Sequence, residues 1–166
     1  RSILFVVDVS RSGLFGSQAG SKLDLTMEVA ALLMLSAQKN NDKVGLLLFA
    51  DGIKGYFPPR KGRAATRRLI RELVAADPND APPAEHDGKT DLAGALQYVC
   101  RVQRRKAIVF VISDFLDEGY ERALRIANAR HDVVALTVAD PRELELPPVG
   151  FVTLEDEETG RIVEVD

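Results

Sequence analysis

The sequence is short of several features that identify common classes of protein. It has one cysteine, Cys100, so no internal disulfide can form and the fold does not depend on an oxidising compartment. No apolar run approaches the roughly 20 residues that cross a bilayer, and no signal-peptide pattern opens the chain. From these absences we expect no direct membrane insertion by this domain and a cytoplasmic location.

Neither acidic nor basic residues are in large excess. The formal net charge is -3, which gives no general attraction to nucleic acid or to an anionic membrane. Basic side chains do gather on one predicted helix, residues 62–76, but no aromatic residues interleave with them to stack on bases. We therefore expect no nucleic-acid partner.

Apolar residues, in contrast, are plentiful. They make up 46% of the 166 residues, which is enough for one domain with a sizeable core. The chain begins at Arg1 without an initiator methionine and enters an apolar run almost at once. We therefore expect residues 1–166 to form a single domain that belongs to a longer protein.

Short, continuous apolar runs predict strands that are buried on both faces, as in parallel sheets. These runs are residues 3–7, 44–49, 107–113 and 133–139. Helical spacing of apolar residues separates them, at residues 22–39, 62–76, from Thr90 or Asp91 onward, and around 120–127. Alternation of this kind predicts a doubly wound α/β fold, with a mostly parallel central sheet and helices on both faces.

The remaining strands are expected at the edges of the sheet. The turn at residues 50–52 is so short that strand 53–57 must run antiparallel to its predecessor, and Pro58-Pro59 is predicted to end it. Alternating residues at 151–154 and 161–165 predict a C-terminal hairpin. The stretch 29–35 is apolar on every side, which predicts a helix that is almost completely buried.

Three segments that should meet at the carboxyl edge of the sheet present oxygen atoms. Asp8, Ser10 and Ser12 follow the first strand, Thr90 begins a helix, and Asp114 ends a later strand. Hard oxygen donors without a nearby histidine or thiolate suit Mg²⁺ or Mn²⁺. The alternative is structural, because the same residue types cap helices and form turns through hydrogen bonds to the backbone.

In order and spacing, these residues resemble the metal-ion-dependent adhesion site (MIDAS) of von Willebrand factor type A domains. The segments DVSRSGLFGS, KVGLLLF, VISDF, DPRELELPPVG and EDEETGRIVEVD are similar, more narrowly, to the bacterial domain-of-unknown-function family 58. Members of that family are typically encoded beside MoxR-type AAA+ ATPases. The resemblance implies a metal-dependent protein-binding module that is not an enzyme and works with such an ATPase.

The resemblance also implies a role for each site residue. Ser10 and Ser12 would bind the divalent ion directly, and Thr90 directly or through water. Asp8 and Asp114 would hold coordinated waters. An acidic side chain of a partner would complete the coordination sphere. This follows physically, because an ion held by hydroxyls and few direct carboxylates keeps an unsatisfied positive charge.

One departure and two alternatives accompany this interpretation. Phe115 follows Asp114 where many type A domains have glycine, and it offers a partner an apolar contact. One alternative is a type A scaffold with a vestigial metal site that binds through another surface. The other is a Mg-dependent phosphatase-like enzyme, although the second aspartate which that chemistry needs is replaced by Ser10. P-loop, dinucleotide-binding and G-x-S-x-G motifs are absent.

Overall fold

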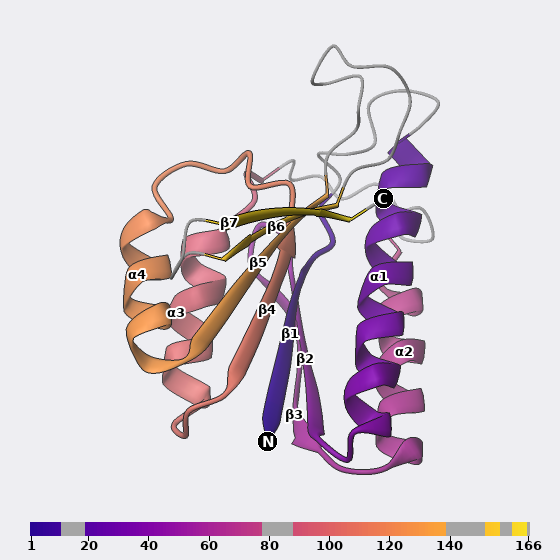
Figure 1. The fold of residues 1–166 in the computed structure, drawn as a ribbon. Coiled ribbons are helices and arrows are strands. Elements are labelled where there is room, and N and C mark those ends of the chain that lie inside the picture. The colour runs from indigo at the N-terminus through magenta and orange to yellow at the C-terminus, as the bar shows by residue number, and fades with distance from the viewer. Residues whose placement is uncertain (11–18, 78–87, 139–151, 157–160, 166) are drawn as a thin grey trace.

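A computed structural model describes residues 1–10, 19–77, 88–138, 152–156 and 161–165 of the chain. Within these ranges the chain forms one sheet between two layers of helices (Figure 1).

All strands of the described residues belong to a single seven-stranded sheet of order β3-β2-β1-β4-β5-β6-β7. In chain order they are β1 (Ser2–Asp8), β2 (Lys43–Phe49), β3 (Ile53–Arg60), β4 (Ile108–Ser113), β5 (Asp132–Val138), β6 (Val152–Asp156) and β7 (Arg161–Val165). Strands β1, β2, β4 and β5 are mutually parallel, whereas β3, β6 and β7 each run antiparallel to the strand before them. The predicted parallel core, antiparallel edge strand and C-terminal hairpin are confirmed.

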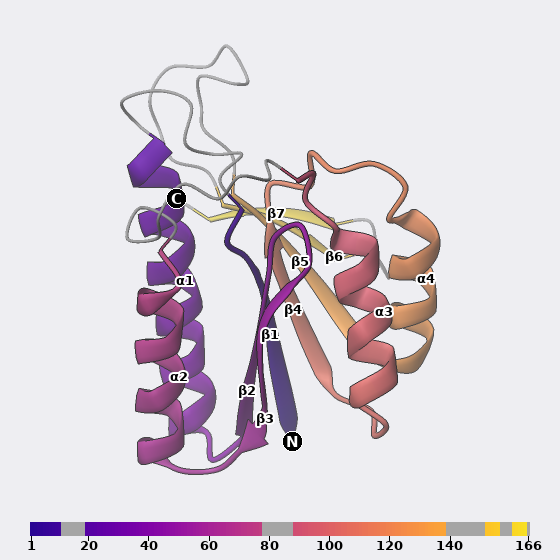
Figure 2. The ribbon, with the colours of Figure 1, turned by 180° about the vertical axis from the view of Figure 1, so that it is seen from behind.

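Four helices of the described residues cover the sheet. They are α1 (Ala19–Lys39), α2 (Arg63–Ala75), α3 (Leu92–Val102) and α4 (Glu121–Arg130). Helices α1 and α2 lie on one face and α3 and α4 on the other, as Figure 2 shows from behind. The prediction of helices on both faces is therefore confirmed. None of the four combines the length and apolar character that a membrane span requires.

Strand β1 lies in the interior of the sheet, between β2 and β4, and its residues are apolar on both faces. Ile3, Phe5 and Val7 belong to the core beneath α1 and α2, whereas Leu4 and Val6 belong to the core beneath α3 and α4. Each of these five side chains is at most 7% exposed. Full burial of such a side chain stabilises the fold by about 1.5–3 kcal/mol. This double burial fixes the position of Asp8 at the end of the strand.

The structure corrects the prediction that Pro58-Pro59 ends the short strand. Strand β3 continues through both prolines to Arg60. It can do so because it is an edge strand, where one row of backbone groups has no strand partner and a missing N–H is tolerated. The register also shifts between Val44 and Leu46 of β2, and a Cβ on Gly45 would lie only 2.8 Å from the backbone of Phe57 and Pro59.

The prediction that residues 29–35 are almost completely buried is also wrong. Leu32 and Leu35 of α1 are 62% and 45% exposed. A helix that covers one face of a sheet buries only the stripe that faces the sheet and its neighbouring helix. The outer side of α1 therefore presents leucines to solvent.

Candidate functional site

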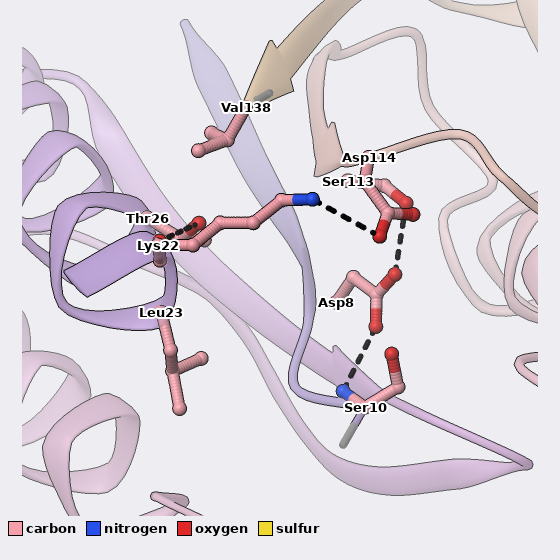
Figure 3. Close-up of a pocket in the computed structure, with 8 residues that line it drawn as sticks. All are labelled: Asp8, Ser10, Lys22, Leu23, Thr26, Ser113, Asp114 and Val138. Atoms are coloured by element: carbon pink, nitrogen blue, oxygen red, sulfur yellow. Dashed lines mark hydrogen bonds and ion pairs between the residues drawn. The ribbon is translucent and has the colours of Figure 1, made fainter. Parts of the chain in front are cut away.

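A small polar pocket lies where the order of the strands reverses. The chain passes from β1 to β2 on one side of β1, and the later strands β4 and β5 are added on the other side. In open α/β sheets, ligands bind at such a switch point, outside the carboxyl ends of the strands. The residues that line the pocket are Asp8, Ser10, Lys22, Leu23, Thr26, Ser113, Asp114 and Val138 (Figure 3).

Asp8 is the most deeply buried carboxylate of this pocket, with 9% of the residue exposed. Its Oδ1 accepts a hydrogen bond from the Ser10 N–H at 2.9 Å, and its Oδ2 accepts one from the Ser113 hydroxyl at 2.8 Å. The Ser113 Oγ in turn accepts the Phe115 N–H at 3.1 Å. These bonds join the ends of β1 and β4 and hold Asp8 in one orientation.

The ionisation of Asp8 reflects its position. Burial raises the pKa of the Asp8 carboxyl above its ordinary value of 3.8, and the nearby Asp114 carboxylate raises it further. Hydrogen bonds from Ser10 and Ser113 act in the opposite direction, since they favour the charged form. A cation in the pocket would relieve the unfavourable contributions of burial and repulsion.

Asp114 lines the same pocket from the loop that follows β4. Its Oδ1 accepts the Leu116 N–H at 3.2 Å, and its Oδ2 lies 3.6 Å from the Lys22 ammonium. The side chains of Lys22 and Asp114 are only 12% and 13% exposed, so this ion pair is largely shielded from solvent. Lys22 extends from α1 across the pocket toward Asp114, as Figure 3 shows.

The other predicted site residues have different surroundings. Thr90 is partly buried just before α3, and it is not one of the described residues that line the pocket. Asp91, rather than Thr90, is the N-cap, because its Oδ1 accepts the Gly94 N–H at 2.8 Å. Asp117 brings this helix terminus to the loop after β4 by accepting the Leu92 N–H at 3.0 Å. Ser12 lies outside the described residues.

Phe115 adopts a backbone conformation that suits glycine. Its φ of 54° lies in the left-handed region, which few side chains other than asparagine and aspartate tolerate. The glycine common at this position in similar domains is therefore explained by the local backbone. The Phe115 ring is partly buried and lies 5.7 Å from the Tyr120 ring, centroid to centroid, which offsets part of the strain.

Five of the lining residues were not predicted from the sequence as parts of the site, and two of these, Ser113 and Lys22, contact its aspartates. In the sequence, Ser113 is only the polar end of an apolar run, and Lys22 is one of several charged residues on a predicted helix. Only the paired ends of β1 and β4 bring Ser113 to Asp8, 105 residues away in sequence. A polar residue directly before a strand-ending aspartate is the one sequence signal that points to Ser113.

The donor atoms of the pocket fit a small hard cation. Two carboxylates and the Ser10 hydroxyl supply oxygen only, and each Asp8 oxygen keeps a second lone pair beside its present hydrogen bond. The described residues contain no group of three or more histidine, cysteine, aspartate or glutamate side chains that could hold a metal ion. A cation here would therefore depend on hydroxyls and water as well as on Asp8 and Asp114.

The strand order and the helical layers define a doubly wound α/β fold, which is consistent with a von Willebrand factor type A-like fold. All residues, 1–166, match the family described as "Protein of unknown function DUF58", and the chain belongs to that family.

Relatives and solved structures of similar fold come from several bacteria. "Uncharacterized protein Rv1480" of Mycobacterium tuberculosis is 35% identical over 160 residues, which cover 96% of this chain and 49% of that protein. The chain thus spans about half the length of this relative. The crystal structure of the conserved hypothetical protein BatB from Bacteroides thetaiotaomicron has a TM-score of 0.61 at 19% identity, covering 98% of this chain and 78% of that one.

A second structure, an aerotolerance-related membrane protein from Bacteroides fragilis, has a TM-score of 0.59 at 18% identity. The match covers 98% of this chain and 80% of that one. At this level of identity, both likenesses show the fold alone.

Proposed function

We propose that this domain is a divalent-metal-dependent protein-binding module. The observation that carries the proposal is the convergence of Asp8, Ser10 and Asp114 in one shielded pocket at the switch point. Ser10 and Ser12 would supply direct hydroxyl ligands, whereas Asp8 and Asp114 would hold coordinated water. Thr90 would join them from the start of α3. The ion, Mg²⁺ or Mn²⁺, would supply a positive charge with an open coordination position.

The partner group that suits such a site is a carboxylate. An ion surrounded by hydroxyls, water and only two nearby carboxylates attracts an external Asp or Glu, because Mg²⁺ prefers six oxygen ligands. The sequence favours binding over turnover, since Ser10 stands where a phosphatase needs its second aspartate. The family resemblance adds a MoxR-type AAA+ ATPase as the partner and an assembly or chaperone-like role in the cytoplasm.

The test compares the wild-type domain with a variant in which Ser10→Ala and Ser12→Ala are combined. Wild type should bind Mn²⁺ with a dissociation constant on the order of millimolar, since an open site with few direct charges binds weakly. Wild type should also capture a purified MoxR-type ATPase from the same genome in Mg²⁺ and lose it in EDTA. The double variant should do neither. Isothermal titration and a pull-down with purified proteins measure the two effects.

The control is Ser36→Ala, because Ser36 is an exposed serine of α1, remote in sequence from the pocket residues. This variant should bind metal and partner like wild type. The double variant should remain folded, because the loss of a turn hydrogen bond reduces stability by only about 1 kcal/mol per residue. Capture that survives both EDTA and the double substitution would refute metal dependence.

One observation favours a second candidate function, a type A scaffold whose metal site is vestigial. Lys22 already supplies a positive charge to Asp114. A protein with a permanent internal cation would bind its partner through another surface, in EDTA as well as in Mg²⁺. The pull-down separates this candidate from the first.

A further inference from the structure

Lys22 occupies an electrostatically unfavourable place in its helix. It is the fourth residue of α1, which begins at Ala19, and the first turn of that helix contains no acidic residue. The partial positive charge of a helix N-terminus disfavours a cation there. Burial adds a further penalty, because only 12% of the Lys22 side chain is exposed. A compensating interaction must therefore hold the ammonium in this position.

The compensation comes from the carboxylates of the pocket. The Lys22 Nζ is 3.6 Å from Asp114 Oδ2, and Asp8 lines the same pocket. With all three groups ionised, the described lining residues carry one net negative charge. The ammonium thus has the electrostatic role toward Asp114 that a bound metal ion would have.

Charge is the second reason why lysine and metal compete. Both would lie beside Asp114, and the positive charge of a divalent ion would repel the ammonium there.

We propose that the Lys22 ammonium competes with the metal ion for this pocket. It pairs with Asp114 when no metal is bound, and it must move away before a divalent ion can bind beside Asp8 and Asp114. This inference rests on the proposed metal-dependent function and adds its regulation. Metal affinity is thereby kept low until a partner carboxylate helps the ion to displace the lysine.

The experiment measures Mn²⁺ binding and melting temperature for wild type and three variants. Lys22→Met removes the charge and keeps the chain length, whereas Lys22→Arg keeps the charge. Lys39→Met is the matched control, because Lys39 is an exposed lysine in the last turn of the same helix. Isothermal titration with MnCl₂ gives the affinity, and thermal unfolding in EDTA and in Mn²⁺ gives the stability.

Lys22→Met should bind Mn²⁺ on the order of tenfold or more tightly than wild type, because a competing charge at a few ångströms is removed. Lys22→Arg and Lys39→Met should stay near wild type. In EDTA, Lys22→Met should melt several degrees lower, since it leaves the shielded Asp114 carboxylate without its cation. Mn²⁺ should then raise its melting temperature by more than it raises that of wild type.

The outcomes distinguish this inference from the proposed function. If wild type binds Mn²⁺ and Lys22→Met binds no more tightly, the lysine does not compete with the metal ion and this inference is overturned. If only Lys22→Met binds, the lysine excludes the ion from the isolated natural domain, which supports the inference and refutes the millimolar affinity expected of wild type under the proposed function. If neither binds, both are refuted. Should Lys22→Met fail to fold in EDTA, Lys22→Gln, which keeps a polar group, is tested in its place by the same two measurements.

Discussion

A pocket and a groove of this molecule differ in the exposure and the sign of their charged residues. The pocket between β1 and β4 is small and has Asp8, Asp114 and Lys22 in its wall. The groove between α3 and α4 is larger, about 270 Å³, with Arg101 and Arg130 beside apolar or weakly polar residues. The pocket charges are mostly shielded and of opposite sign, whereas the groove charges are exposed and of one sign.

The difference shows where strong electrostatic selectivity can arise. Both arginines of the groove already interact with the protein: the Arg130 Nη1 donates to the Cys100 carbonyl at 3.0 Å, and the Arg101 guanidinium lies 5.2 Å from the Tyr98 ring centroid. Exposed charges of this kind contribute little binding energy and are screened by salt. Shielded charges in the pocket are screened much less, so any strong electrostatic preference would arise there and not in the groove.

The largest effect is expected when the pocket is broken at Asp8. Asp8→Ala leaves the Ser10 N–H and the Ser113 hydroxyl without their acceptor. Because hydrogen bonds to a charged group contribute about 1.5–3 kcal/mol each and are not additive, the variant should lose about 3 kcal/mol of unfolding free energy. For a domain of this size that is a fall of roughly 10 °C in melting temperature. Urea denaturation in EDTA measures the change.

Asp132→Ala is the control for this loss, because Asp132 pairs with Lys106 at 2.9 Å on the open surface, where both side chains are more than half exposed. Its effect should stay below about 1 kcal/mol. Equal losses for the two aspartates would mean that the hydrogen bonds of Asp8 do not hold the end of β1.

A smaller effect is expected at the end of the groove, where His131 follows Arg130. Burial lowers the pKa of His131 below its ordinary value of 6.5, Arg130 lowers it further, and Asp132 partly opposes them. The neutral ring accepts the Ala107 N–H at Nδ1, at 3.3 Å. The unfolded chain therefore takes up the proton first, and stability falls as the pH drops below about 6.5.

Replacement by a residue that does not titrate tests this dependence. His131→Gln should reduce the loss of stability between about pH 7.5 and pH 5, by at most about 1.4 kcal/mol per pH unit. Urea denaturation at a series of pH values provides the comparison. Parallel pH profiles for the variant and wild type would show that His131 does not titrate in this range.

The smallest effect is expected from Ile126→Glu, which places a charge in the groove. Ile126 is 45% exposed, so stability should change by about 0.5 kcal/mol or less. Mn²⁺ binding and capture of the ATPase should be unchanged if the pocket is the binding site. If Ile126→Glu abolishes capture of the ATPase while wild-type capture is insensitive to EDTA, the groove rather than the pocket is the binding surface.

The sequence predicted the centre of the sheet better than its edges. Continuous apolar runs identify β1 and β4 because both faces of a central strand are buried. The prolines of β3 suggested an earlier end, since their effect depends on which side of the strand is paired, and tertiary structure decides that. The exposure of Leu32 was missed for the same reason, because helical apolar character does not reveal how many sides are covered.

In the candidate site, the strand-ending aspartates could be predicted and their immediate partners could not. Asp8 and Asp114 follow apolar runs, so the topology alone brings them to one edge. The contact of Lys22 with Asp114 joins residues from α1 and the loop after β4, far apart in the chain. A lysine on a helix near many acidic residues gives no sign of which one it will meet.

The prolines of β3 have a consequence for the way copies of this protein meet. An edge strand with free N–H and C=O groups is a template on which another chain can add a strand and begin to aggregate. Pro58 and Pro59 each lack an N–H donor, and the irregular register beside them bends the strand away from an ideal ladder. Growth of the sheet past β3 is therefore disfavoured.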